Sequence, residues 1–272
     1  MIQSQALTDA LAGTIFRTVI SVEETDSTNS FALASAASGE DEGLVVLADR
    51  QTAGRGRHGR SWFSPPGTNI HMSLLLRPYL NARDASLLTI MTAVGACAAL
   101  REAAHCDAGI QWPNDIVLNG KKLGGILIEA RTENRLVIIA VIGIGINVNV
   151  LITELPDEIK ASATSLRAEI GTVFEREKIT LALLKNIDSL HRTLFSRHAG
   201  SLERSVRRSA RDMLIHRWKE LDMTLGKSIA VKTSRGVLRG KAMDVDGYGM
   251  LHVMTADGRI VKIHAGDISI ED

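Results

Sequence analysis

The stretch from residue 109 to residue 148 constrains the fold most, because it reads as strands that follow one another with no helix between them. The string IQWPNDIVLNGKKLGGILIEA predicts a strand, an interruption at Pro113, a second strand, a tight turn at Asn119–Gly120 and a third strand. A long strand over 136–148 comes next. Strands joined directly by hairpins pair antiparallel. We therefore expect an α+β fold on a mixed, largely antiparallel sheet flanked by helices, and not an alternating βαβ fold.

The rest of the chain adds helices before a change of texture near residue 220. Apolar spacing and cap residues predict helices over 5–16, 29–37, 82–105 and 178–218, with strands over 18–22, 44–49 and 69–78. Asp26, Ser27 and Thr28 offer N-cap side chains for the second of these helices. From about residue 224 the sequence turns to short strands separated by glycine-rich turns, which is typical of a small β-barrel. We expect two domains, at 1–220 and 221–272.

Composition excludes several classes of protein. Lys and Arg total 32 against 31 Asp and Glu, so the formal charge of +1 disfavours a protein that coats nucleic acid. Cys97 and Cys106 form no C-x-x-C pair, which argues against a structural metal or a disulfide framework. The first 17 residues lack the pattern of a signal peptide. The apolar run over 136–152 is too short for a membrane span and predicts a buried strand. These features indicate a cytoplasmic protein.

The string RQTAGRGRHGRSW (50–62) is the first candidate for function, since it combines alternating Gly and Arg with His58 and Trp62. Glycines let the backbone approach a ligand, and arginines supply forked donors for carboxylate or phosphate. Most arginine-rich loops are solvated turns, but this density of features favours a loop that binds an anionic ligand. It is not a Walker loop, because G-K-[ST] and a following helix are missing.

Two further strings place polar groups where strands end. In QWPND, Trp112 is expected to anchor the core, whereas Asn114 and Asp115 could orient a nucleotide or hold Mg²⁺. Lys121 and Lys122 precede a Gly-Gly strand and could be solvated or could neutralise an anion. GIGIN (143–147) lacks the third glycine and the helix of a dinucleotide fingerprint. We read no catalytic triad, so any chemistry must come from positioning and electrostatics.

Taken in order, the strings ETDSTNSFA, RQTAGRGRHGRSWFSP, QWPNDI, KKLGGILIE and GIGINVN resemble the catalytic domain of the biotin protein ligases (biotin–[acetyl-CoA-carboxylase] ligases). HRWKELD and the terminal β segment resemble the small SH3-like domain of that family. The resemblance implies a catalytic domain like that of class II aminoacyl-tRNA synthetases. It also implies a ligase that joins biotin to ATP with Mg²⁺, giving biotinyl-5′-AMP, and passes biotin to a lysine of the biotin carboxyl carrier protein of acetyl-CoA carboxylase.

The same resemblance assigns roles to residues. Ser27, Thr28 and Gln51 would bind the ureido head of biotin with Asn29 beside them, and Arg55, Arg57 and Lys122 would be the catalytic cations on its carboxylate and phosphate. The full set expected around biotin is Ser27, Thr28, Asn29, Gln51, Gly54, Arg55, Gly56, Arg57, Lys122, Gly125, Gly143 and Gly145. The set expected around the adenylate is Arg55, Arg57, Trp62, Asn114, Asp115, Lys122 and Asn147, with Asp115 as the candidate Mg²⁺ ligand. The glycines of the basic loop would also permit it to order only when ligand arrives.

Two departures from the family pattern stand out. Gln111 replaces the lysine of the common K-W-P-N-D string, so Lys121, Lys122 or an arginine supplies the local charge, or turnover is altered. Only 26 residues precede Ser27, too few for a winged helix-turn-helix, which suggests a monofunctional ligase that does not bind DNA.

Two rival functions stay open. A lipoate–protein ligase shares the fold and the same two reaction steps, adenylation of an acid and its transfer to a lysine. Lipoate, however, has no ureido ring for Ser27, Thr28 and Gln51 to bind. A non-enzymatic nucleic-acid-binding module would use Arg55, Arg57 and Arg60 with the terminal β segment, against which the near-zero charge counts. A homodimer formed through a sheet edge is a further hypothesis.

Overall fold

The chain folds around an eight-stranded mixed sheet in the computed structural model, which describes residues 1–195, 203–233 and 236–271. The strand order is β1-β2-β3-β8-β7-β6-β5, and β4 pairs with β8. Only β1 and β2 run parallel. The strands are β1 (Thr18–Thr25), β2 (Leu44–Gln51), β3 (Ile70–Leu76), β4 (Leu80–Asn81), β5 (Gly109–Gln111), β6 (Asp115–Leu118), β7 (Lys121–Glu133) and β8 (Leu136–Ile146). The expected mixed, largely antiparallel sheet is confirmed.

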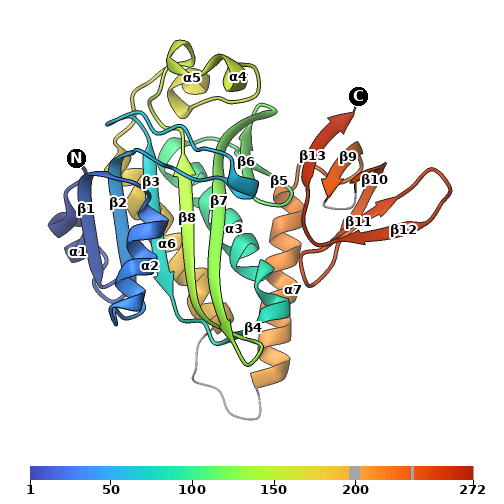
Figure 1. Cartoon of the computed structure of the whole chain (residues 1–272), viewed down its shortest axis with the longest axis horizontal. Coiled ribbons are helices and arrows are strands. Elements are labelled where there is room, and N and C mark those ends of the chain that lie inside the picture. The colour runs from blue at the N-terminus through green and yellow to red at the C-terminus, as the bar shows by residue number, and fades with distance from the viewer. Residues whose placement is uncertain (196–202, 234–235, 272) are drawn as a thin grey trace.

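Helices cover the two faces of this sheet unequally. Figure 1 shows α3 (Ser86–Ala104), α6 (Arg176–Phe195) and α7 (Glu203–Leu221) behind the sheet, with α2 (Thr28–Ala37) in front of it. The main apolar core lies behind the sheet, between it and α3 and α6. The shorter elements are α1 (Ser4–Ala10), α4 (Asp157–Lys160), α5 (Leu166–Ile170) and the 3₁₀ turns η1 (Arg57–Gly59), η2 (Ala82–Asp84) and η3 (Ile152–Glu154).

The front face changes character where α2 begins. Leu75 and Val141, which lie on neighbouring strands, pack against Ala32 and Ala36 of α2. The next residues on the same face are the register pairs Ser73/Gly143 and His71/Gly145. Alternate residues of a strand share a face. Beyond the first turn of α2, the residues on this face are therefore a serine, a histidine and two glycines, and α2 no longer covers them with apolar side chains. This uncovered part of the front face carries the site.

A second sheet follows α7. Its five antiparallel strands lie in the order β12-β11-β10-β9-β13. They are β9 (Ser228–Thr233), β10 (Gly236–Val245), β11 (Leu251–Met254), β12 (Ile260–Ile263) and β13 (Asp267–Glu271). Trp112, only 3% exposed, holds this sheet to the first one, because its Nε1 donates to Gly249 O at 3.0 Å. Trp112 is therefore the core anchor that the sequence predicted.

Several predicted boundaries were wrong. The helix expected over 5–16 ends at Ala10, since Gly13 takes a positive φ of 85° and the Thr14 hydroxyl donates to Leu11 O at 2.7 Å. The helix expected over 82–105 starts as a 3₁₀ turn, and α3 itself begins at Ser86. The segment expected to be helical over 178–218 forms α6 and α7, and its residues 196–202 lie outside the described part.

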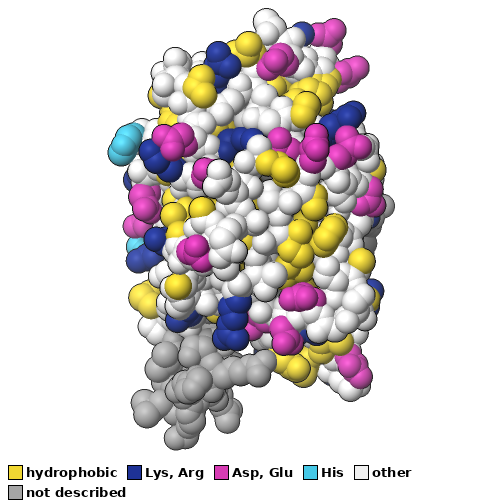
Figure 2. Space-filling view, turned by 90° about the vertical axis from the view of Figure 1, so that its left-hand side faces the viewer, with side chains coloured by type: hydrophobic (Ala, Val, Ile, Leu, Met, Phe, Trp, Pro, Cys, Tyr) yellow, Lys and Arg dark blue, Asp and Glu magenta, His cyan; other side chains and the backbone are white. Residues whose placement is uncertain are grey.

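Among the described residues, one helical segment, Ala82–Ala104, which joins η2 to α3, is long and apolar enough to cross a membrane, but 72% of its most apolar 18-residue window is buried, which identifies it as a core helix. The apolar run at 136–152 contains a buried strand, as predicted, but that strand, β8, ends at Ile146. Acidic and basic side chains are interspersed over the face that adjoins β1 and α1 (Figure 2). That mixture agrees with the near-zero net charge.

Candidate active site

The N-terminus of α2 forms the polar end of the site. Ser27 is the N-cap residue, but its hydroxyl does not cap the helix, contrary to the capping role expected. Gln51 of β2 takes that role instead, because its Oε1 accepts from the Thr28 backbone N–H at 2.9 Å. The Gln51 side-chain amide also donates to Ser64 Oγ at 3.2 Å. Ser27 and Thr28 are each only 3% exposed and line the cavity.

Asn29 and Ser73 continue this polar end across the sheet. Ser73 Oγ lies 2.7 Å from Thr28 Oγ1 and 2.6 Å from Asn29 Oδ1. Asn29 Nδ2 donates to Glu129 Oε2 at 2.8 Å. A Cβ on Gly143 would lie 3.1 Å from Asn29 Cγ and closer still to its Oδ1. The space above Gly143 is therefore filled by the Asn29 amide, whereas the sequence had assigned it to a ligand.

Trp62 lies on a platform made by two paired glycines. Gly125 of β7 faces Gly145 of β8. A Cβ on Gly145 would fall 2.5 Å from Trp62 Cε2, and one on Gly125 would fall 3.3 Å from Cζ3. The indole Nε1 is buried and has no hydrogen-bond partner among the described residues. Lys122 Nζ sits 5.7 Å from the centre of the ring.

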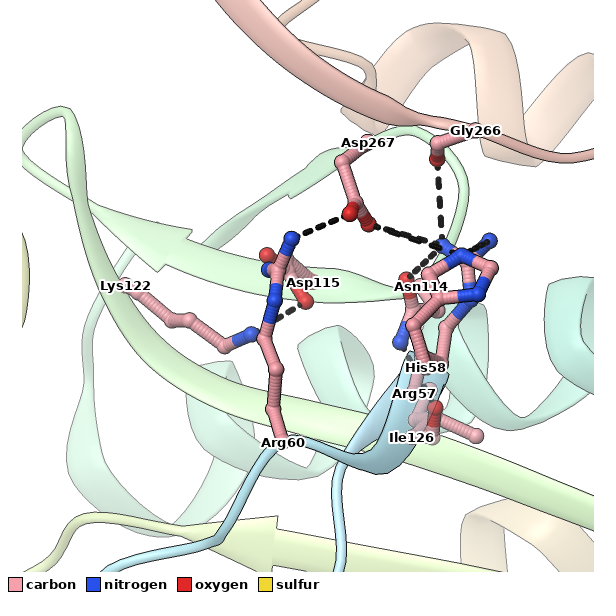
Figure 3. A network of polar contacts seen from close by, with 9 residues as sticks. All are labelled: Arg57, His58, Arg60, Asn114, Asp115, Lys122, Ile126, Gly266 and Asp267. Carbon is pink, nitrogen blue, oxygen red and sulfur yellow. Dashed lines mark hydrogen bonds and ion pairs between the residues drawn. The ribbon is translucent and has the colours of Figure 1, made fainter. Parts of the chain in front are cut away.

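The basic loop is held at both ends by carboxylates. Arg55 Nη2 donates to Glu129 Oε2 at 2.8 Å. Figure 3 shows the other end, where Arg57, His58 and Arg60 gather around Asp267 of the C-terminal sheet. Arg57 Nη1 also donates to Asn114 Oδ1 at 3.0 Å and to Gly266 O at 3.2 Å. Burial lowers the pKa of Arg57, and the nearby Asp267 and Asp115 carboxylates act in the opposite direction.

Lys122 and Asp115 form the third part of the site. Lys122 Nζ donates to Asp115 Oδ1 at 2.6 Å (Figure 3). Asn114 Nδ2 donates to Ile126 O at 2.7 Å, which leaves its Oδ1 for Arg57. Asn147 lies deeper, with Nδ2 donating to Thr164 O at 2.9 Å and Oδ1 accepting from Asn69. Both polar groups of the Asn147 side chain are thus already engaged within the protein.

These groups surround one cavity of about 440 Å³. Every residue expected around biotin or the adenylate lines it except Gly54, which packs behind the loop, where a Cβ would lie 2.8 Å from Trp62 O. Thr28, Gln51 and their neighbours supply neutral donors and acceptors at one end. Arg57, Arg60 and Lys122 supply cations at the other end. The cavity therefore suits a ligand of drug size with a neutral polar head and an anionic tail.

Four contributors were missed in the sequence. Ser73 and Glu129 lie on strands and complete the polar end, while Gly266 and Asp267 reach the basic loop from the far end of the chain. Glu129 was visible as the acidic residue that closes the KKLGGILIE string. Nothing local to Gly266 or Asp267 signals a contact with a loop some 200 positions earlier.

Family models match nearly all of the first sheet and the C-terminal sheet. The model described as "Biotin/lipoate A/B protein ligase family" matches residues 21–147, and the one described as "Biotin protein ligase C terminal domain" matches residues 224–270. A Mycobacterium tuberculosis biotin–[acetyl-CoA-carboxylase] ligase is 32% identical over 277 residues, which cover 98% of this chain and 95% of the relative.

The chain belongs to the biotin protein ligase family.

Two other members place this chain within the family. The bifunctional ligase/repressor BirA of Bacillus subtilis is 36% identical over 229 residues, and that match spans 84% of this chain and 66% of the relative. The structure of a biotin protein ligase from Aquifex aeolicus in complex with biotin and ATP has a TM-score of 0.75 and 28% identity, and the match covers 94% of this chain and 99% of that one.

The biotin protein ligase pattern carries a lysine where this chain has Gln111. Gln111 lines the cavity, but the cations that line it come from other residues: Arg55, Arg57, Arg60 and Lys122. Lys121 is exposed at the turn. Of the two lysines, Lys122 is therefore the one that the fold places in the site.

The carboxylates of the site do not form a ready cage for a divalent cation. Within residues 1–195, 203–233 and 236–271, no three His, Cys, Asp or Glu side chains are grouped to hold a metal. Asp115 is already paired with Lys122. Mg²⁺ commonly binds proteins through one or two carboxylates and substrate phosphates. A magnesium ion that enters with a nucleotide therefore fits this donor set better than a resident ion.

Proposed function

We propose that the protein activates biotin with ATP, giving biotinyl-5′-AMP and diphosphate, and transfers biotin to a lysine of the biotin carboxyl carrier protein of a carboxylase. One observation carries this proposal beyond family membership: the cavity joins a buried, neutral hydrogen-bonding floor to a cluster of cations. Biotin has the matching form, with a neutral ureido ring at one end and a carboxylate at the other.

In this proposal the head of biotin lies at the N-terminus of α2. Ser27, Thr28 and Gln51 bind the ureido ring, and Asn29 supports them. The tail runs along the Trp62 ring, which covers the Gly125–Gly145 platform, toward Lys122. The biotin carboxylate then lies within reach of Arg55, Arg57 and Lys122, the three proposed catalytic cations. Gly56 keeps the loop backbone close to the ligand, and Gly54 supports that loop from behind.

The reaction needs two nucleophilic attacks and no nucleophile from this chain. A biotin carboxylate oxygen bonds to the α-phosphorus of ATP, and the bond from that phosphorus to the bridging oxygen of diphosphate breaks. The carrier lysine amine then attacks the biotinyl carbonyl, AMP leaves, and the amine loses a proton. Arg57 and Lys122 stabilise the negative charge that develops on the phosphoryl and carboxyl oxygens. Magnesium bound to the phosphates would neutralise further charge.

The adenylate end is formed by Trp62, Asn114, Asp115 and Asn147. The Trp62 ring offers a face on which an adenine or the biotin tail can pack. Asn114 orients Arg57, and Asp115 orients Lys122. We assign Asp115 two roles: its carboxylate orients Lys122 in the free protein and would contact Mg²⁺ when the nucleotide is bound, at the expense of part of its contact with Lys122.

The remaining proposals concern the whole molecule. Residues 1–220 act as the catalytic domain, of the class II aminoacyl-tRNA synthetase type, and residues 221–272 as an SH3-like domain; α7 ends at Leu221, just before the second sheet. The protein acts in the cytoplasm, on its own or as a homodimer. Sedimentation with and without biotin tests the dimer, since a mass that never changes would exclude a ligand-driven one.

ATP–diphosphate exchange with Mg²⁺ tests the function, run in parallel with biotin, lipoate and no acid. Exchange that depends on biotin is the expected result. Exchange with lipoate alone would keep the fold but overturn the substrate. The polar set around Thr28 and Gln51 favours biotin, because the dithiolane ring of lipoate has no N–H or carbonyl group to satisfy it. No exchange with either acid would refute the proposal.

A further inference from the structure

Glu129 occupies an unusual place in the site, because one of its oxygens serves two different parts of it. Oε2 accepts from Asn29 Nδ2 at 2.8 Å, and the same oxygen accepts from Arg55 Nη2 at 2.8 Å. Asn29 is 3% exposed, whereas the Arg55 side chain is 42% exposed. Loss of the buried contact with Asn29 should therefore cost more free energy than loss of the contact with Arg55, since an exposed ion pair contributes little and is screened by water.

The contact with Glu129 decides which way the Asn29 amide points. An ionised carboxylate only accepts hydrogen bonds, so the atom of Asn29 that faces it must be the NH₂ group. The amide oxygen then faces Ser73 Oγ at 2.6 Å. Since that oxygen also only accepts, the single hydroxyl proton of Ser73 must be directed toward Asn29.

The direction of the Ser73 hydrogen bond also fixes the direction of the hydrogen bond between Ser73 and the Thr28 hydroxyl. Ser73 Oγ also lies 2.7 Å from Thr28 Oγ1, and its only proton is already used, so Thr28 must donate to Ser73 for this contact to be a hydrogen bond. The longer contact from Thr28 Oγ1 to Gln51 Oε1, at 3.1 Å, is then secondary. Thr28 is thereby left with lone pairs, and no proton, to offer the cavity.

We propose that Glu129 is a positioning residue that fixes the hydrogen-bond polarity of the head pocket, acting through Asn29 and Ser73 to make Thr28 an acceptor for a ligand N–H. This inference rests on the proposed function, in which the ligand is biotin and the N–H belongs to its ureido ring. Without Glu129, only the longer contact from Asn29 Nδ2 to Leu127 O, at 3.5 Å, opposes a flip of the amide. Ser73 would then donate to Thr28, and the Thr28 proton would be divided between the longer contact to Gln51 Oε1, at 3.1 Å, and the cavity, where it would oppose the ligand N–H.

The test is the KM for biotin in ATP–diphosphate exchange, measured for Glu129→Ala, Glu129→Gln and, as a matched control on the same strand, Glu133→Ala. A hydrogen bond to a charged group is worth enough to change binding by about tenfold or more. We expect Glu129→Ala to raise KM by at least about tenfold and to change kcat far less. Glu129→Gln, which keeps an acceptor, should stay within about threefold of the wild type, as should the control.

A double-mutant cycle separates the two partners of Glu129. In an Asn29→Ala background, Glu129→Ala should have no further effect on KM, because the path to Thr28 is already broken. A further rise in that background would show that the effect passes through Arg55, and it would overturn the proposal. So would a Glu129→Ala enzyme whose KM is within twofold of the wild type.

A second pair of variants tests the same proposal if the Glu129→Ala protein does not fold. Asn29→Asp places two carboxylates against each other and should weaken biotin binding, and adding Glu129→Gln should recover at least about tenfold by restoring a donor between them. Failure to recover would count against the proposal. If the wild-type protein shows no biotin-dependent exchange, the proposed function itself fails; wild-type exchange with unaffected Glu129 variants would refute only the role of Glu129.

Discussion

Substituting Gly145 by Ala tests whether Trp62 lies on the glycine platform of the free protein. The new Cβ would fall between 2.5 and 2.7 Å from three atoms of the indole, where about 3.5 Å is the closest comfortable approach. The ring must therefore move by about 1 Å and lose its packing. Overpacking of this kind costs about 1–3 kcal/mol, from which the usual gain for Gly→Ala within a strand, about 0.5–1 kcal/mol, is subtracted.

The net expectation is a loss of about 0–2.5 kcal/mol in the free energy of unfolding, centred near about 1 kcal/mol, or a Tm lower by about 2–4 °C in a chain of this size. In a Trp62→Ala background the clash is gone, and the same Gly145→Ala change should stabilise by about 0.5–1 kcal/mol. The predicted reversal of sign makes this a sharp test. Gly247→Ala is the matched control, since its Cβ would meet only Arg211 Cδ, at 3.8 Å.

Tryptophan fluorescence gives an independent measurement. Trp112 and Trp218 are 3% and 0% exposed, so Trp62 is the tryptophan whose surroundings can change. Gly145→Ala should shift the emission to longer wavelength as the indole leaves the platform. An unchanged spectrum, together with equal stability effects in the two backgrounds, would refute the placement of Trp62 on Gly145.

Three more outcomes follow from the contacts of the site and core. Arg55→Ala should speed the release of biotinyl-5′-AMP without lowering Tm, because Arg55 reaches over the cavity from an exposed loop; unchanged release would contradict its role as a lid residue. Asp267→Ala should slow exchange by about threefold to tenfold, since it removes the carboxylate that gathers Arg57 and Arg60, and a change in Tm alone would argue against this. Burial lowers the pKa of His71 to about 4, below its value near 6.5 in the unfolded chain. Between these two values the unfolded state binds a proton that the folded state does not. The free energy of unfolding therefore falls as the pH drops from about 6.5 to about 4. Urea unfolding at pH 5 and pH 7.5 measures the free energy of unfolding at each pH. The decrease between pH 7.5 and pH 5 should be smaller for His71→Phe than for the wild type. The full contribution of His71, reached below pH 4, is about 3 kcal/mol.

Local patterns in the sequence were sufficient to predict a largely antiparallel sheet, and the family resemblance implied most of the residues that line the cavity. The Asn119–Gly120 pair takes the positive φ values, 51° and 76°, that a tight hairpin turn requires. The order of hairpins then fixed a largely antiparallel sheet. The same local reasoning failed at two helix boundaries, because Gly13 takes a positive φ just beyond the early end of α1 and residues 82–84 form a 3₁₀ turn before α3, and apolar spacing reports neither.

The residues that the sequence could not assign are those whose partners are remote. A glycine in a strand indicates that something approaches closely, but not what it is: Asn29 fills the space above Gly143, and Trp62 that above Gly145. Glu129 follows a buried strand and could equally well be solvated. Its role depends on the register between β7 and β8 and on the placement of α2, which only the folded chain defines.

The arrangement of charges bears on how the proposed substrates would bind. Every arginine that we assign to the ligand is already satisfied in the free protein, Arg55 by Glu129 and Arg57 by Asn114, Gly266 and Asp267. A half-buried cation without a partner is costly, so these internal acceptors stabilise the site before a substrate arrives. An incoming carboxylate or phosphate must therefore displace the Glu129 carboxylate at Arg55, and at Arg57 it competes with two neutral oxygens and with Asp267 at 3.9 Å. The net binding energy is the difference between two similar contacts, and discrimination then depends mainly on the neutral floor at Thr28 and Gln51, where nothing of comparable strength has to be displaced.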